Sequence, residues 1–74
     1  MAVMLARERG GGVAQEREVI FEFVQIGNAV KVTAVDVESG VEAVVVGDPA
    51  AGEPALKRLA KQKLDYVLAK RGDT

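Results

Sequence analysis

The sequence contains no cysteine and no histidine. Without cysteine it has neither a disulfide nor a thiolate metal site. Without histidine it lacks the commonest metal ligand and the commonest general base. No run approaches the roughly 18 apolar residues of a membrane-spanning helix, and residues 1–6 are too short for the apolar core of a signal peptide. These absences predict a cytoplasmic protein with no metal, no cofactor and no membrane contact.

The chain has 74 residues, of which 49% are hydrophobic, and a net charge of −1. This length allows a single domain, and the apolar fraction is too high for a disordered protein. A domain of this size buries only about 60% of its unfolded surface, so it needs a good core or a partner subunit. The charge is unevenly distributed, because residues 53–74 carry six cations and three carboxylates.

Residues 19–36 give the clearest structural signal. Two runs rich in β-branched and aromatic residues flank a Gly27-Asn28 pair, which is typical of a tight β-hairpin. We expect strands over residues 17–26 and 29–35. A two-residue turn sets Phe23 opposite Val32, and it sets Phe21 opposite Ala34.

Residues 36–40, Asp-Val-Glu-Ser-Gly, predict a second turn with a loop of four residues, 37–40. A third strand is expected over residues 41–46. A helix is then expected from Pro54 to Lys70 or Arg71, with Gly72 as its stop. Its predicted apolar stripe consists of Leu56, Leu59, Ala60, Leu64, Val67 and Leu68.

The predicted fold class is therefore α+β. It is a three-stranded antiparallel meander, in the order 1-2-3, with one C-terminal amphipathic helix packed on one face. The domain is expected to span residues 16–72. Three consecutive glycines, residues 10–12, act as a flexible linker. Residues 1–15 are accordingly predicted to be a disordered tail, with an N-terminal helix as the alternative.

The predicted register sorts the strand residues onto two faces. One face is almost wholly apolar and matches the helix stripe. The other face mixes Glu22, Lys31, Thr33 and Glu42 with exposed aliphatic side chains. An apolar patch of this kind usually marks an interface, and the third strand is also a short edge. The predicted protein interface, in a homodimer or with another protein, consists of Ile20, Val24, Ile26, Val35, Val44 and Val46.

The start of the predicted helix carries a cluster of three cations, Lys57, Arg58 and Lys61. The sequence Lys-Arg-Leu-Ala-Lys resembles the start of the last helix of double-stranded RNA-binding domains. That resemblance implies phosphate contacts by these three residues. The first helix of that family has a counterpart only if residues 1–9 form one. A nucleic-acid-binding module is therefore the alternative function.

Carboxylates are plentiful, but Glu22 and Glu42 are spaced as neighbours of Lys31 and Thr33 on a solvated sheet face. A catalytic acid pair needs a concave, desolvated site, which three strands and a helix do not offer. Residues 47–54 have the glycine spacing of a phosphate loop, but lack its Lys and Ser/Thr. The protein is therefore not expected to be an enzyme, and no catalytic, cofactor-binding or metal-binding residue is predicted.

The stretch EVIFEFVQIGNAVKVTAVDVESG, together with the helix end LDYVLAKR, resembles a family of short uncharacterised bacterial proteins. The resemblance covers residues 18–70. It implies a βββα domain with these bounds. The family has no established activity, so the resemblance implies no function. The functional hypothesis is a small non-enzymatic domain that acts through protein–protein contact as a homodimer.

Overall fold

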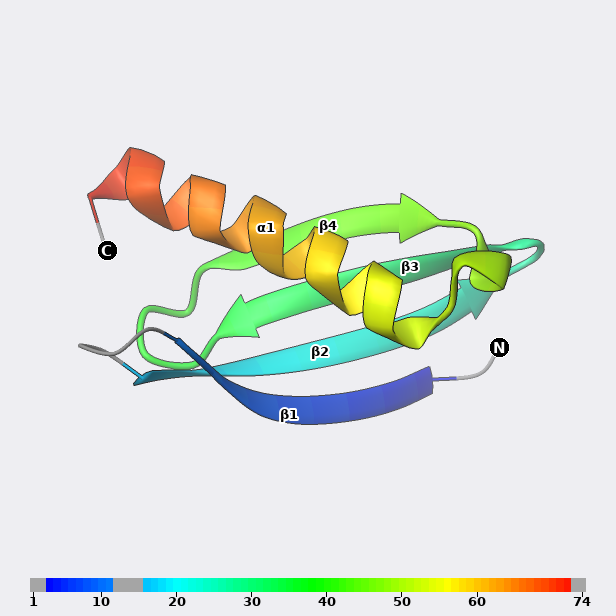
Figure 1. Ribbon diagram of the computed structural model, residues 1–74, viewed down its shortest axis with the longest axis horizontal. Coiled ribbons are helices and arrows are strands. Elements are labelled where there is room, and N and C mark those ends of the chain that lie inside the picture. The colour runs from blue at the N-terminus through cyan, green and yellow to red at the C-terminus, as the bar shows by residue number, and fades with distance from the viewer. Residues whose placement is uncertain (1–2, 12–15, 73–74) are drawn as a thin grey trace.

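The computed structural model describes residues 3–11 and 16–72, and it describes side chains from residue 18 onward. The described chain forms a four-stranded antiparallel sheet in the order β1-β2-β3-β4 (Figure 1). One long helix, α1, lies across one face of this sheet. The predicted α+β class, the order of the three predicted strands and the single covering helix are confirmed. The sheet contains one strand more than was predicted.

The central hairpin joins β2 (Glu16–Ile26) to β3 (Ala29–Asp36). Gly27 has a φ of 59°, while Asn28 keeps a negative φ, which is the pattern of a type II′ turn. This turn matches the right-handed twist of the strands that it joins. The predicted register is confirmed from Ile26↔Ala29 through Phe21↔Ala34.

A second hairpin joins β3 to β4 (Glu42–Gly47). The N–H of Asp36 donates to the carbonyl of Val41 at 2.9 Å, so these two residues face each other across the predicted four-residue loop, 37–40. The buried Asp36 organises this loop. Its carboxylate accepts hydrogen bonds from the N–H and Oγ of Ser39, at 3.1 and 2.6 Å, and its carbonyl accepts one from the N–H of Gly40 at 2.7 Å. Gly40 has a φ of 77°, which favours glycine. The resulting register sets Ala34 opposite Ala43.

The fourth strand is β1 (Val3–Gly11), at the edge of the sheet beside β2. It pairs with β2 from Val3↔Val24 to Gly11↔Glu16. The prediction of a disordered tail is therefore wrong for residues 3–11, while residues 1–2 and 12–15 lie outside the described residues. The long edge of β2 provides backbone partners for this segment, and those partners offset the cost of ordering it.

The sheet is followed by a short 3₁₀ helix, η1 (Pro49–Ala51), and then by α1 (Glu53–Arg71). Asp48 caps η1, because its Oδ1 accepts a hydrogen bond from the N–H of Ala50 at 2.9 Å. Gly72 ends α1 in the left-handed conformation, with a φ of 79°, and its N–H donates to the carbonyl of Ala69. The predicted helix and its glycine stop are confirmed.

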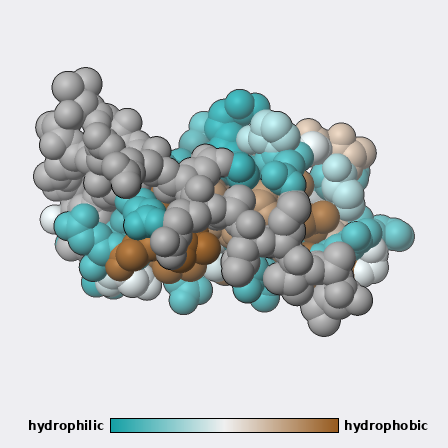
Figure 2. All heavy atoms as spheres, turned by 90° about the horizontal axis from the view of Figure 1, so that it is seen from below, coloured by the Kyte–Doolittle hydropathy of each residue, from teal (hydrophilic) through white to brown (hydrophobic). Residues whose placement is uncertain are grey.

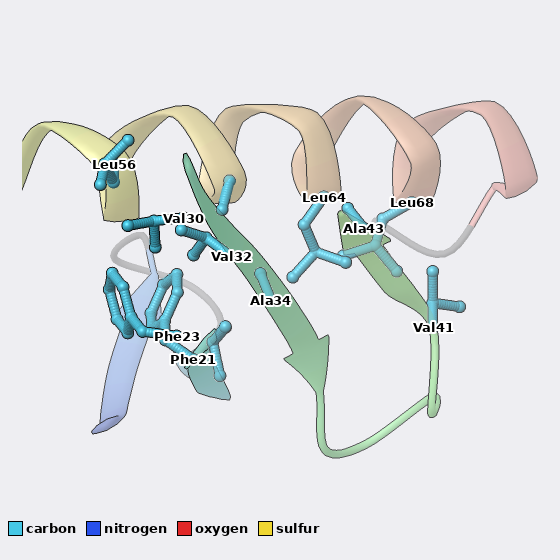
Figure 3. Close-up of a cluster of buried hydrophobic side chains, with 12 residues drawn as sticks. Phe21, Phe23, Val30, Val32, Ala34, Val41, Ala43, Leu56, Leu64 and Leu68 are labelled. Carbon is cyan, nitrogen blue, oxygen red and sulfur yellow. The ribbon is translucent and has the colours of Figure 1, made fainter. Parts of the chain in front are cut away.

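The core lies between α1 and the sheet face toward it (Figure 3). The helix contributes residues at every fourth position, Leu56, Ala60, Leu64 and Leu68. The strands and the β3–β4 loop contribute Val19, Phe21, Phe23, Val30, Val32, Ala34, Val41 and Ala43. Because an α-helix has about 3.6 residues per turn, residues four apart are slightly offset around the axis, and the buried stripe winds gradually around the helix. As a result, Leu59 is 52% exposed, and its predicted place in the buried stripe is wrong.

Candidate functional site

The first candidate site is the sheet face that points away from α1, here called the open face. Ile20, Val24 and Val35 are half-buried there. Three other aliphatic residues are exposed, namely Ile26 at 55%, Val44 at 38% and Val46 at 68%. All six residues of the predicted interface therefore share one face, as the register required.

The polar residues of the open face lie among these aliphatic side chains. Lys31 stands between Val24 and Val46, in one row across three strands. Glu22 and Val44 flank Thr33 in the next row, and Thr33 is buried although it faces outward. Glu42 belongs to the row beyond, so Glu22 and Glu42 do not converge on one point. The open face is thus an apolar surface with separated charges rather than an acidic pair.

The free edge of β4 is partly blocked by the helix. Nζ of Lys63 donates a hydrogen bond to the carbonyl oxygen of Val44 at 2.7 Å. Covering a strand edge with a helix or a charged side chain is a common way to keep it from pairing with another strand. The carbonyl group of Val44 on β4 is therefore already bound within the chain.

The second candidate site lies on the opposite side of the sheet, where α1 leaves a groove beside β2. We call it the basic groove. It has a volume of about 350 Å³. Its lining consists of Val19, Phe21, Glu53, Pro54, Lys57, Arg58 and Lys61. The structure therefore brings together the three cations that the sequence singled out, and it adds two residues of β2 and two of the first helical turn.

The remaining described lysines of α1 point elsewhere. Lys63 lies on the edge of β4, and the ammonium group of Lys70 lies 5.5 Å from the ring centroid of Tyr66. Lys61 itself forms an exposed ion pair with Asp65 at 3.1 Å. The positive charges of α1 therefore do not form one continuous surface. Three of them, on Lys57, Arg58 and Lys61, lie together at the basic groove.

The groove floor was not found by sequence reasoning. Val19 and Phe21 lie more than thirty positions before Pro54 in the chain, and only the packing of α1 beside β2 places them together. The single usable signal was the helical spacing of Lys57 and Lys61, which sets both on one flank of α1. Figure 2 views the molecule from below and shows brown hydrophobic surface interrupted by teal polar side chains.

The two candidate sites differ in the charge and polarity of their described residues. Among the described residues no group of three or more acidic side chains is placed to hold a metal ion. The described lining of the basic groove contains one carboxylate, Glu53, and three cations. Chemically, such an arrangement can attract an anion. The open face, with its exposed valine and isoleucine, can bury apolar surface.

The fold and the two surfaces define a small α+β domain built on an antiparallel meander with one covering helix. The chain belongs to the family described as a domain of unknown function (DUF6898), whose model matches residues 16–71. This match confirms the resemblance to a family without an assigned activity. It begins with β2, so β1 lies before the matched segment. Comparisons with curated proteins and with solved structures found no match.

Two further observations bear on the sequence predictions. Residues 3–11 form a strand, so the first helix of double-stranded RNA-binding domains has no counterpart there. The partial resemblance to those domains is thus limited to the later strands and α1. In the described part of the chain, the helices are too short or too polar to cross a membrane.

Proposed function

We propose that this domain is a non-enzymatic protein-contact module that forms a homodimer through the open face. The observation that carries the proposal is the contrast between the two sides of one sheet. The side toward α1 supplies buried core residues, whereas the other side leaves Val44 and Val46 exposed at 38% and 68%. Burying apolar side chains yields about 25 cal/mol per Å² of surface removed from water.

The size of the open face is adequate for a small specific interface. Four strands spaced about 4.8 Å apart, over about eight residues each, give a face of roughly 19 by 25 Å. Side-chain relief raises the accessible area above this flat footprint. The flat footprint of the four strands, β1 included, is thus about half of the roughly 800 Å² per partner of standard interfaces, and the side-chain relief narrows that difference.

The charges of the open face favour a second copy as the partner. A two-fold dimer brings the same patch of both subunits together, so each charge needs an opposite charge on that same patch. The patch supplies both signs, because Lys31 lies on it with Glu22 and Glu42. Lys31 can thus face a carboxylate of the partner, and the aliphatic residues around it exclude water.

The test is the oligomeric state, measured by analytical ultracentrifugation over a range of concentrations. The wild-type chain is expected to sediment as a dimer. Val46→Lys and Val44→Lys are expected to give monomers with unchanged far-UV circular dichroism, since each introduces two lysines into a symmetric interface. Leu59→Lys is the matched control, because it places the same change at a similarly exposed aliphatic residue on α1.

Two outcomes would contradict the proposal. One is a wild-type chain that stays monomeric at millimolar concentration. The other is a dimer that survives both valine substitutions but is lost in Leu59→Lys, which would assign the contact to the outer side of α1. The proposed compartment is the cytoplasm of a bacterial cell. It is supported by the absence of cysteine from the chain, and cell fractionation tests it.

A further inference from the structure

A second contact site, independent of the open face, lies in the basic groove. We infer that this groove binds a short acidic segment of a partner protein, held by its carboxylates. The recognising side chains are those of Arg58 and Lys61, with Lys57 beside them. The groove lies on the side of the sheet opposite the proposed dimer interface, so both contacts can be made at once.

The placement of the cations follows from helix geometry. Lys57 and Lys61 are four residues apart, which is about one turn and about 6 Å along the axis. Both lie on the flank of α1 that meets Val19 and Phe21 of β2. Of the residues whose side chains the structure describes, three cations and one carboxylate, Glu53, line the groove, and their charges sum to an excess of positive charge over a short length.

The floor of the groove indicates that charge, rather than apolar burial, selects the ligand. Val19 and Phe21 are only 1% and 2% exposed, so they offer a ligand little apolar surface. The ammonium group of Lys57 lies 5.8 Å from the ring centroid of Phe21 and covers the floor from above. Little of Val19 and Phe21 is therefore open to an apolar ligand, whereas Arg58 and Lys61 at the rim offer charge to an anion.

The extent of the charge favours an acidic segment over a nucleic acid. Recognition of duplex RNA needs several separate contacts along the backbone. The described cations beyond the groove do not extend it. Lys63 is bound to the edge of β4 and Lys70 lies over Tyr66. Arg71 ends α1 ten residues after Lys61, and Lys31 lies on the open face. A patch about 6 Å long is matched by one or two carboxylates.

The ion pair between Lys61 and Asp65 does not prevent this binding. The two side chains are 31% and 56% exposed. Such exposed pairs are weak, and an incoming carboxylate can replace that of Asp65 on Lys61. Arg58 is exposed, and its planar guanidinium can bind a carboxylate through two hydrogen bonds. Arg58 is therefore the most informative position to change.

The experiment uses a fluorescein-labelled octapeptide with six glutamates and follows its fluorescence anisotropy on titration with the full chain. Binding is expected in 50 mM NaCl and is expected to weaken at least tenfold in 300 mM NaCl. Arg58→Glu should weaken it at least tenfold. Lys70→Glu carries the same charge change at the other end of α1, and it should change the affinity less than twofold.

Three results would overturn the inference. They are no binding of the peptide in 50 mM NaCl, equal binding of a peptide with glutamine in place of glutamate, and equal losses in Arg58→Glu and Lys70→Glu. Tighter binding of a duplex RNA of about 16 base pairs, lost in Arg58→Glu, would assign the groove to nucleic acid instead. Peptide binding that persists in the Val46→Lys variant would show that the groove works independently of the dimer interface.

Discussion

Gly47 is the last residue of β4, and the fold requires a glycine there because a Cβ atom has no room. Its backbone conformation is one that other residues can adopt. Its φ is not in the positive range that favours glycine. A Cβ atom built at this position meets Cδ2 of Leu56 well inside the normal contact distance. Leu56 is 3% exposed and belongs to the core, so its side chain has little room to move. Gly47→Ala should therefore overpack the junction between β4 and α1.

The expected cost can be bounded. Overpacking a core by a methyl group costs about 1–3 kcal/mol. Replacing glycine by alanine restricts the unfolded chain and returns about 0.4–1 kcal/mol. The net destabilisation should therefore lie between about 0 and 2.6 kcal/mol. Urea unfolding followed by circular dichroism measures it, at one fixed protein concentration because association would contribute to stability.

A double-mutant cycle tests the mechanism rather than the sign alone. Leu56→Val removes the Cδ atoms that the new Cβ would meet, so Gly47→Ala should cost nothing or become slightly stabilising in that background. Gly40→Ala is the control. A Cβ at Gly40 meets no atom within 4 Å, but the residue has a φ of 77°. Its cost should not change in Leu56→Val. A Gly47→Ala variant that is more stable than wild type, or one whose cost persists in Leu56→Val, would refute the steric explanation.

Two further predictions concern the stability of the core and of the β3–β4 loop, each measured as the free energy of unfolding. Leu64→Ala, at a site with 0% exposure, should cost about 2–5 kcal/mol. Leu59→Ala, at 52% exposure, should stay within about 0.5 kcal/mol, and equal costs would contradict the assigned orientation of α1. Asp36→Ala removes the acceptor of two hydrogen bonds from Ser39 and should cost about 1–3 kcal/mol. Ser39→Ala should cost less, since its N–H still donates to Asp36, and the reverse order would refute this account of the loop.

The central part of the fold could be predicted because local chemistry and face patterning agree there. The Gly27-Asn28 turn fixes one register, and that register places Phe21 and Phe23 on the face that α1 covers. The loop after Asp36 fixes the second register in the same way, through hydrogen bonds within five residues. Short-range signals of this kind are readable from a single sequence.

The features that were missed depend on groups far apart in the chain. Strand β1 is held by pairing with β2, and the three glycines of residues 10–12 indicated a linker instead. The exposure of Leu59 depends on the direction in which α1 crosses β3 and β4, which the helix pattern alone does not specify. The basic groove depends on how α1 lies beside β2. The cations could be named from the sequence, but not the surface that they share.

The strand order has a consequence for how the chain reaches this fold. Every strand pairs with the strand that precedes or follows it in the chain, and the β2–β3 turn is only two residues long. Pairing between chain neighbours closes short loops at a small entropic cost, which favours rapid folding. The paired edges of β2 and β3, and the sheet face that α1 covers, should therefore be exposed only briefly while the chain folds. A chain with this much aliphatic surface thereby spends little time in the states from which aggregation begins.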